Sequence, residues 1–388
     1  MYLTKQEERM LNGEYGWANQ VSTKILVRLG DLFGATKLIP IQSAHLSGVS
    51  YKHLGDAAIE FLNELATHGG KAKTLATLNP SSLDQEILAK RYSKERFAKQ
   101  QEIIELYEKM RIESTLTCTP YYLQTPKPGQ HLAWAESSAV IYANSVLKAW
   151  TNREGAPSAL AAALVGKTPN YGVHQPENRQ PNALVRLKTK LQTEADYGAL
   201  GIHLGKLLKE KIPAIDGLSG SDDELKQLGA AMASSGMTAL FHIGASSKQT
   251  KLETISVEAK DIEETASSLC TTDQPPDLVF IGCPHCSINE VRNVACALKG
   301  KKVHRDAELW VCTSRHVKES AKTYVDIIQR AGGNVLCDTC VLVTWIKDLG
   351  VDTVMTNSAK TAFYAPTLND VDVALRPMKH CIDAACQH

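Results

Sequence analysis

LVFIGCPHCSINEVRNVACAL, residues Leu278–Leu298, joins a short run of large apolar residues to a segment whose apolar residues recur at helical spacing. Leu278–Gly282 has the continuous apolar character of a strand that is buried on both faces, and Ile288–Leu298 predicts a helix. Strand and helix patterns continue to alternate downstream, with a strand at Ala307–Cys312, a helix at Val317–Ala331, a strand at Asn334–Leu336, a helix near Leu342–Leu349, a strand at Thr353–Met355 and a loop at Thr356–Ala359. The alternation predicts a doubly wound α/β sheet of parallel strands, in which ligands approach the carboxyl ends of the strands.

The N-terminal part of the chain shows the same kind of alternation. Helical periodicity covers Thr4–Gly13 and Trp17–Phe33, and a helical stretch at Gly55–His68 lies between β-type runs at Lys37–Ile41 and Lys73–Thr77. These runs predict a β-α-β unit, and the charged, amphipathic segment Asp84–Ile112 predicts a pair of surface helices. A chain of 388 residues is expected to form more than one domain. We predict an N-terminal α/β region at 1–115, a central region at 116–270 and the doubly wound region at 271–388.

Composition excludes several classes of function. Lys and Arg number 43 against 42 Asp and Glu, without a basic run, so the charge pattern of a nucleic-acid-binding protein is absent. The longest apolar runs, Ala159–Val165 and Leu278–Gly282, are far shorter than the roughly 20 residues of a membrane helix. The charged N-terminus Met1–Glu14 has no apolar core, so it does not have the pattern of a secretory signal. We therefore expect a cytoplasmic protein with a small-molecule ligand.

Ten cysteines in a chain of this length predict reduced thiols, some of them with metal-binding roles. Two Cys-x-x-Cys pairs, Cys283 with Cys286 and Cys337 with Cys340, follow predicted strands. Such pairs can hold zinc or act in redox chemistry, although the helices and strands between them are unlike a compact zinc ribbon. Cys118, in a loop rich in hydroxyl groups, is a third candidate. An iron-sulfur cluster that acts as a Lewis acid needs only three thiolates, because one iron must stay open to substrate.

The sequence resembles the aconitase X family over essentially its whole length. The resemblance is carried by motifs in a fixed order: SAHLSGVSY at Ser43–Tyr51, TLNP at Thr77–Pro80, CTPY at Cys118–Tyr121, WAESSA at Trp134–Ala139, TNREG at Thr151–Gly155, GKTP at Gly166–Pro169, GCPH at Gly282–His285, DTC at Asp338–Cys340 and SAK at Ser358–Lys360. It implies an aconitase-like multi-domain α/β architecture, with parallel or mixed sheets flanked by helices around a central cleft. It also implies a 4Fe-4S cluster bound by Cys118, Cys283 and Cys340.

The resemblance also implies substrate-binding residues, which are Gly48, Val49, Ser50, Asn79, Pro80, Glu136, Ser137 and Lys360. Each has a simpler structural explanation when the family is set aside. The loop 47–50 and Asn79-Pro80 are also typical of turns, and Glu136 and Ser137 are also typical of helix caps. Arg153 and Lys167 are candidate cations for carboxylate or phosphate, or solvated surface charges. His285 is expected to form hydrogen bonds near the cluster.

The activity implied by the resemblance is the removal of water from a hydroxy acid. We expect the substrate to be (R)-5-phosphomevalonate, which is converted to trans-anhydromevalonate 5-phosphate in the archaeal mevalonate pathway. A cis-3-hydroxy-L-proline dehydratase of the same family is the alternative substrate class, and a noncatalytic zinc-binding scaffold is the alternative from another class. In the family the catalytic base is a serine on a small swivelling domain. The chain is too short after Lys360 to hold such a domain, so we expect a separate small subunit and a heterodimer.

Overall fold

The computed structural model describes residues 1–244 and 252–386 and divides into two compact units. Unit 1 consists of residues 1–83 and 88–180, and unit 2 consists of residues 84–87 and the chain from Pro181 onward. The short segment 84–87 thus belongs to unit 2, although both of its flanks belong to unit 1. Within the described residues, no helix is both long enough and apolar enough to span a membrane.

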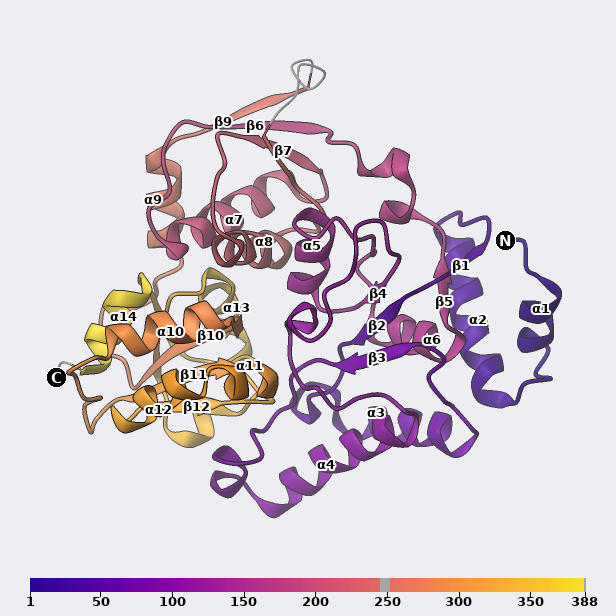
Figure 1. Ribbon diagram of the computed structural model, residues 1–388, viewed down its shortest axis with the longest axis horizontal. Coiled ribbons are helices and arrows are strands. Elements are labelled where there is room, and N and C mark those ends of the chain that lie inside the picture. Colours follow the sequence, from indigo (N-terminus) through magenta and orange to yellow (C-terminus); the bar gives the residue numbers. More distant parts are fainter. Residues whose placement is uncertain (245–251, 387–388) are drawn as a thin grey trace. The chain divides into compact units, whose positions relative to one another are not determined.

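Unit 1 is built around a small parallel sheet (Figure 1). Its elements in chain order are α1 (Lys5–Leu11), α2 (Trp17–Leu32), β1 (Leu38–Pro40), β2 (Ser43–Leu46), α3 (Tyr51–Thr67), β3 (Leu75–Leu78), the 3₁₀ turn η1 (Leu88–Arg91), α4 (Lys94–Lys109), η2 (Pro120–Tyr122), β4 (Ala133–Trp134), α5 (Ser137–Ser145), α6 (Ala156–Val165), β5 (Lys167–Pro169), η3 (Gly172–His174) and η4 (Pro176–Arg179). The parallel strands have the order β3-β2-β4, and β1 pairs with β5 in a separate antiparallel ladder.

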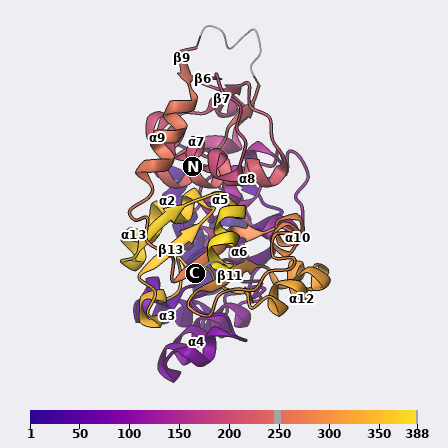
Figure 2. The same cartoon turned by 90° about the vertical axis from the view of Figure 1, so that its left-hand side faces the viewer.

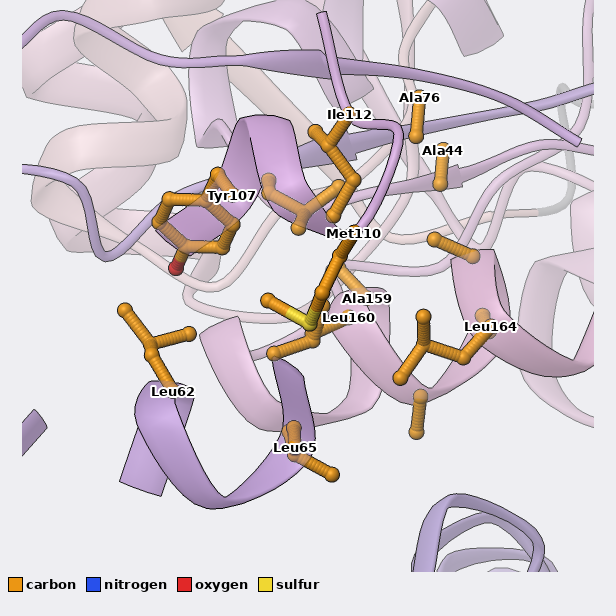
Figure 3. Close-up of a cluster of buried hydrophobic side chains, with 14 of the residues drawn as sticks. Ala44, Leu62, Leu65, Ala76, Tyr107, Met110, Ile112, Ala159, Leu160 and Leu164 are labelled. Carbon is orange, nitrogen blue, oxygen red and sulfur yellow. The ribbon is translucent and has the colours of Figure 1, made fainter. Parts of the chain in front are cut away.

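The core of unit 1 lies between this sheet and three helices. Figure 3 shows Leu62 and Leu65 of α3, Met110 at the end of α4, and Leu160 and Leu164 of α6 pointing toward one another. Each of these five side chains is at most 3% exposed. Residues 156–165 are apolar on every side, which fits a helix enclosed by its neighbours, and α6 packs on both α2 and β2. The helices therefore anchor the strands whose ends carry the candidate site.

Residues 113–118 extend the sheet beside β3. Glu113 forms a parallel bridge with Thr77, and its amide donates to the carbonyl of Ala76 at 2.9 Å. The amide of Thr117 donates to the carbonyl of Leu78 at 3.0 Å. The segment therefore runs in the same direction as β3 and delivers Cys118 to the carboxyl edge of the sheet.

Unit 2 contains two parallel sheets. Its elements in chain order are β6 (Ala183–Leu187), α7 (Glu194–Leu208), β7 (Pro213–Asp216), α8 (Asp222–Ser235), β8 (His242–Ile243), β9 (Thr254–Val257), α9 (Ala259–Ser268), β10 (Leu278–Cys286), α10 (Ile288–Ala297), β11 (Glu308–Thr313), α11 (Arg315–Ser320), α12 (Lys322–Arg330), β12 (Asn334–Leu336), η6 (Ile346–Leu349), β13 (Thr353–Thr356), α13 (Ala359–Asn369), β14 (Asp372–Leu375) and α14 (Met378–Cys386). One sheet has the order β8-β7-β6-β9 and the other β12-β11-β10-β13-β14.

The five-stranded sheet has helices on both faces. On one face α14 packs on β10, β11 and β13, and α10 lies between α12 and α14. On the other face α13 packs on β13 and β14, and α8 packs on β10. Figure 2 shows α13 on one side of these strands, and α10 and α12 on the other. All four ladders are parallel, which confirms the doubly wound arrangement predicted from Leu278 onward.

The α/β class with parallel sheets flanked by helices is confirmed, whereas several local predictions are wrong. The β-α-β unit uses β2, and the predicted run 37–41 forms the edge ladder with β5 instead. The predicted helix pair in 84–112 is the single helix α4 after a short 3₁₀ turn. The helix predicted at 317–331 is broken at Ala321, and that predicted at 342–349 is only a 3₁₀ turn.

The C-terminus also differs from expectation. The sequence around Cys381 and Cys386 suggests a mobile tail, but this segment forms α14. Cys381 is fully buried because α14 packs on the five-stranded sheet.

Candidate active site

The candidate residues of unit 1 gather at one edge of its sheet. The loop 47–50 follows β2, Asn79-Pro80 follows β3, and Glu136 and Ser137 come directly after β4. Because β2, β3 and β4 are neighbouring parallel strands, their carboxyl ends meet at the same edge. Cys118 reaches this edge through the segment beside β3. The structure thus brings Cys118 and the proposed substrate-binding residues of unit 1 to one sheet edge.

The loop 47–50 is held in shape from behind. Gly48 has a φ of +81°, and a Cβ there would lie 2.7 Å from the Cβ of Ala156, so the position requires glycine. The Tyr107 hydroxyl donates to the carbonyl of Gly48 at 2.9 Å, and the Gln100 side-chain amide donates to the carbonyl of Val49 at 2.9 Å. With both carbonyls occupied by these donors, the loop has a fixed shape that leads into the N-terminus of α3.

Glu136 has a structural role that is compatible with a place in the site. It is the N-cap of α5, and its Oε1 accepts hydrogen bonds from the Ser138 amide at 3.2 Å and hydroxyl at 2.8 Å. Its Oε2 accepts a hydrogen bond from Nδ2 of Asn79 at 2.9 Å. The capping role considered from the sequence is therefore confirmed, and it leaves the carboxylate half-buried beside Asn79.

His45 is buried and contacts Asn79. Its Nδ1 lies 2.8 Å from Oγ1 of Thr77, and its Nε2 lies 3.4 Å from Oδ1 of Asn79. Burial lowers the pKa of His45 to about 4, partly offset by the charge of Glu136 and the hydrogen bond to Asn79. The sequence named no partner for this histidine, because nothing in the motif reveals that Thr77 lies opposite it on β3 or that Asn79 follows that strand.

Lys167 and Arg153, for which the sequence left open a binding role or a place on the surface, differ in environment. Lys167 pairs with the buried carboxylate of Glu7, with 2.6 Å between Nζ and Oε1. Hydrogen bonding to Lys167 and Thr4 lowers the pKa of Glu7, although burial alone would raise it. Lys167 thus serves the packing of α1, while Arg153 is half-buried in the loop before α6.

The candidate residues of unit 2 gather at the carboxyl edge of the five-stranded sheet. Cys283 lies in β10, Cys340 follows β12, and Lys360 lies in the first turn of α13 after β13. Cys283 and Lys360 both lie close enough to Cys340 to influence its pKa, which Cys283 raises and Lys360 lowers. The structure thus brings these three candidates into one neighbourhood. All three side chains are buried, with exposures of 3% for Cys283, 7% for Cys340 and 9% for Lys360.

Cys283 lies in a bulge of β10. Ile281 pairs with Val311 and Cys286 pairs with Thr313. A step of five residues along β10 therefore corresponds to a step of two residues along β11. The bulge starts at Gly282, whose φ is +124° and where a Cβ would lie 2.3 Å from the carbonyl oxygen of Cys312. Only glycine can lie so close to the neighbouring strand. The residues 283–285 are therefore displaced from the regular ladder.

The loop between Cys337 and Cys340 is held by carboxylates. Asp338 has a φ of +66°, and its buried carboxylate accepts hydrogen bonds from Nε and Nη2 of Arg315. Oδ2 of Asp84 accepts a hydrogen bond from the amide of Cys337 at 3.0 Å. His285 donates from Nε2 to the carbonyl of Thr339 at 2.9 Å, which places this histidine beside the Cys340 loop.

A buried ion pair supports the bulge of β10 that carries Cys283. The Lys226 ammonium on α8, with 1% of its side chain exposed, pairs with Glu290 on α10 and donates to the carbonyl of His285. Burial raises the pKa of Glu290, and the neighbouring Lys226 offsets part of that rise. Lys226 therefore connects α8 with the bulge that carries Cys283. Sequence reasoning missed it, because a lysine in a charged helical segment is usually exposed.

Two thiols of unit 2 are protonated at neutral pH. Burial raises the pKa of Cys340 to about 12 and that of Cys337 to about 12. Across residues 1–244 and 252–386, no three His, Cys, Asp or Glu side chains form a group that could hold a metal ion.

Three buried polar atoms near Cys340 and Lys360 have no protein hydrogen-bond partner. They are Oγ1 of Thr339, Oδ1 of Asn357 and Oγ1 of Thr361. Asn357 and Thr361 lie at the start of α13 on either side of Lys360, and Thr339 precedes Cys340. Buried groups of this kind are normally satisfied, so a bound molecule is one explanation for them. Thr339 lies in the DTC motif of the resemblance, whereas no quoted motif includes Asn357 or Thr361.

Comparison with known proteins covers nearly the whole chain. The family models for the aconitase X first, second and third domains match residues 1–177, 181–267 and 276–387. The crystal structure of Thermococcus kodakaraensis aconitase X in its holo-form superimposes with a TM-score of 0.92 at 45% identity, covering 99% of this chain and 100% of that one.

Curated relatives fall into two groups. The phosphomevalonate dehydratase large subunit of Methanocaldococcus jannaschii is 48% identical, over 95% of this chain and 96% of that protein. That of Methanosarcina mazei is 44% identical, over 99% and 97%. The cis-3-hydroxy-L-proline dehydratase of Pseudomonas aeruginosa is 32% identical, over 98% of this chain but 69% of that longer protein.

Proposed function

The chain belongs to the aconitase X family, and from this premise we propose that it is the large subunit of a phosphomevalonate dehydratase. Its reaction would convert (R)-5-phosphomevalonate to trans-anhydromevalonate 5-phosphate and water. The observation that carries the proposal is the 48% identity to a large subunit of that name over 95% of the chain, against 32% for a hydroxyproline dehydratase.

The donor set fits an iron-sulfur cluster. Cys118, Cys283 and Cys340 form no disulfide and are at most 7% exposed, and each lies at the carboxyl edge of a parallel sheet. We propose that these three hold a 4Fe-4S cluster, which when bound would supply a Lewis acid for the departing hydroxyl. The zinc-scaffold alternative gains no support, because the relatives that match nearly the whole chain are named as dehydratases.

The side chains of unit 1 are suited to bind an anion and orient a hydroxyl group. The loop 47–50 leads into the N-terminus of α3, whose dipole favours negative charge, while the amides of Tyr51 and Lys52 are bonded to Gln100 and Ser82. Asn79 and Glu136 present an amide and a carboxylate at the next two strand ends. We assign Gly48, Val49, Ser50, Asn79, Pro80, Glu136 and Ser137 to substrate binding on this basis.

Lys360 supplies the cation in unit 2. Its ammonium is buried in the first turn of α13, where the Ser358 side chain caps the helix by accepting from the amide of Thr361. A buried cation binds a carboxylate or phosphate more strongly than an exposed one, because water screens the pair less. We therefore assign Lys360 to an anionic group of the substrate.

The proton must leave from the carbon next to the hydroxyl-bearing carbon. We propose that a serine of a separate small subunit, carried on a swivelling domain, is the base. The naming of the archaeal relatives as large subunits supports a partner of this kind. The chain by itself is then expected to bind substrate without turning it over.

Anaerobic reconstitution with iron and sulfide, together with an archaeal small subunit, tests the proposal. Water loss is measured for (R)-5-phosphomevalonate and for cis-3-hydroxy-L-proline in parallel. We expect kcat/KM for the phosphate ester to exceed that for the amino acid by about 100-fold or more, because unpaired buried polar groups penalise the wrong substrate. A preference for hydroxyproline would refute the choice of substrate, and turnover without the small subunit would refute the assignment of the base.

A further inference from the structure

The hydrogen bonds around His45 form a chain with only one consistent direction. The groups involved, all in unit 1, are the Thr77 hydroxyl, the His45 ring, the Asn79 amide and the Glu136 carboxylate. Only Asn79 and Glu136 are partly exposed, whereas Thr77 is 7% exposed and His45 is fully buried. The chain thus leads from the interior of the sheet to its carboxyl edge.

The carboxylate fixes which end of the Asn79 amide faces it. Glu136 accepts two hydrogen bonds from Ser138 on Oε1, as an ionised carboxylate does, and offers only lone pairs on Oε2. The group that faces Oε2 at 2.9 Å must therefore be a donor, which is Nδ2 of Asn79. The Oδ1 atom then faces the histidine, and the reverse orientation would place two acceptors against each other.

The amide orientation in turn fixes the histidine tautomer. Since Oδ1 of Asn79 is an acceptor, Nε2 of His45 must carry the proton to form the 3.4 Å contact. Nδ1 is then an acceptor, so the Thr77 hydroxyl donates to it over 2.8 Å. The imidazole holds a single proton at neutral pH, because burial keeps its pKa at about 4.

The ring itself is prevented from turning. Trp134 stands edge-on to His45, with ring centroids 6.2 Å apart, and its indole Nε1 is held by the Ser43 hydroxyl at 3.1 Å. Both residues belong to paired strands, since His45 is opposite Trp134 in the ladder of β2 and β4. The ring is therefore held with Nε2 toward Asn79 and Nδ1 toward Thr77.

We propose that His45 is a positioning residue that, as its Nε2–H tautomer, holds the Asn79 amide with its NH₂ group toward Glu136. The inference deepens the proposed function, because it rests on Asn79 and Glu136 binding substrate. The second amide hydrogen of Asn79 and the carboxylate oxygens of Glu136 are then presented in one fixed arrangement, which selects a substrate hydroxyl of matching orientation.

Nitrogen-15 NMR of the full-length chain tests the tautomer directly, without any substrate. The ring signals of His45 are assigned by their loss in His45→Gln. We expect a protonated Nε2 and an unprotonated Nδ1 at pH 7. A protonated Nδ1, or a fast mixture of tautomers, would overturn the proposal.

Variants at the two ends of the chain provide the matched test of direction. Thr77→Val keeps the shape but removes the hydroxyl, and we expect His45 to keep its proton on Nε2, because Glu136 and Asn79 set the direction. Glu136→Gln removes the carboxylate that fixes the Asn79 amide, and we expect it to give a mixture of tautomers. An Nδ1–H form in Thr77→Val, or an unchanged single tautomer in Glu136→Gln, would contradict the inference.

Turnover separates positioning from simple packing. His45→Gln keeps a donor for Asn79, whereas His45→Leu removes it, and we expect kcat/KM to be at least about tenfold lower in the leucine variant. Equal values would show that the donor is irrelevant. If the tautomer is as inferred but neither substrate is dehydrated, the proposed function fails while the hydrogen-bond chain stands. Dehydration by a chain whose His45 carries its proton on Nδ1 would instead support the proposed function and refute the role of His45.

Discussion

At the carboxyl edge of the unit 1 sheet, hydrogen bonds among mostly neutral groups hold the candidate side chains, whereas in unit 2 buried ion pairs hold the backbone around the thiols. His45 and Asn79 illustrate the first arrangement. Lys226 with Glu290 and Arg315 with Asp338 illustrate the second. Directed neutral hydrogen bonds fix the orientation of a side chain, and ion pairs fix the position of a loop. The hydrogen bonds of unit 1 suit the proposed substrate-binding residues there, and the ion pairs of unit 2 suit a role in holding Cys283 and Cys340 in place.

The largest effect is expected for the thiols of unit 2. Cys340→Ser should remove bound iron and lower kcat/KM about 1000-fold or more, because a lost Lewis acid is worth several kcal/mol in the transition state. Cys337→Ser is the matched control, since Cys337 is also buried in the same loop, at 1% exposure against 7% for Cys340, and is not an assigned ligand. Iron content and turnover are measured on anaerobically reconstituted protein. Equal iron loss in both variants would contradict the choice of Cys340.

A large stability effect is expected for the buried ion pair of unit 2. Lys226→Met leaves Glu290 without its cation in a buried place, and we expect the free energy of unfolding to fall by about 3–5 kcal/mol. The double variant Lys226→Met with Glu290→Gln should lose clearly less, because the more buried carboxylate loses its charge together with the cation and only the more exposed Asp223 stays charged. Urea unfolding measures both. A double variant as unstable as the single one would mean that packing, and not charge, explains the loss.

The neutral network of unit 1 predicts sensitivity to acid. Burial lowers the pKa of His45 to about 4, so the unfolded chain takes up a proton at higher pH than the folded chain does. Stability should therefore fall as the pH drops from about 6.5 to about 4, by about 3 kcal/mol for this residue. Comparing urea unfolding of the parent chain and His45→Gln across this range isolates the contribution. An identical pH dependence in both would refute it.

A smaller effect on the free energy of unfolding is expected for the ion pair between Arg315 and Asp338, which holds the Cys340 loop. Arg315→Ala removes the partner of the buried Asp338 carboxylate, and we expect a loss of about 2 kcal/mol because the arginine itself is half-exposed. Lys318→Ala is the matched control, since it breaks only a more exposed pair with Glu86 and should cost less than about 1 kcal/mol. Equal losses would remove the distinction between buried and exposed pairs.

The sequence predicted four of the five strands of the C-terminal sheet, because each is a short apolar run between helical segments, but it missed β14, Asp372–Leu375. It missed β2, since Ser43–Leu46 has no β-branched residue and includes a histidine. That omission also hid His45, whose partners come from β3 and the loop after it. Regular patterning thus predicts elements, while pairing between strands determines which polar residues meet.

The candidate residues were chosen from motifs, and the structure groups them at two sheet edges. The residues behind them could not be chosen in this way. Lys226, Arg315 and Asp84 carry charges that are common on surfaces, and only the fold shows that they hold the thiol loops. A residue that acts through a contact distant in sequence leaves no local pattern.

Iron bound by the Cys118→Ser variant tests the central proposal most directly, because Cys118 belongs to unit 1 while Cys283 and Cys340 belong to unit 2. The measurement is iron and sulfide per chain after anaerobic reconstitution, with Cys270→Ser as a control outside the proposed ligand set. We expect the Cys118 variant to retain little or no cluster and the control to bind as much as the parent chain. A Cys118→Ser chain with its full content of iron and sulfide would contradict a cluster held by thiolates from both units.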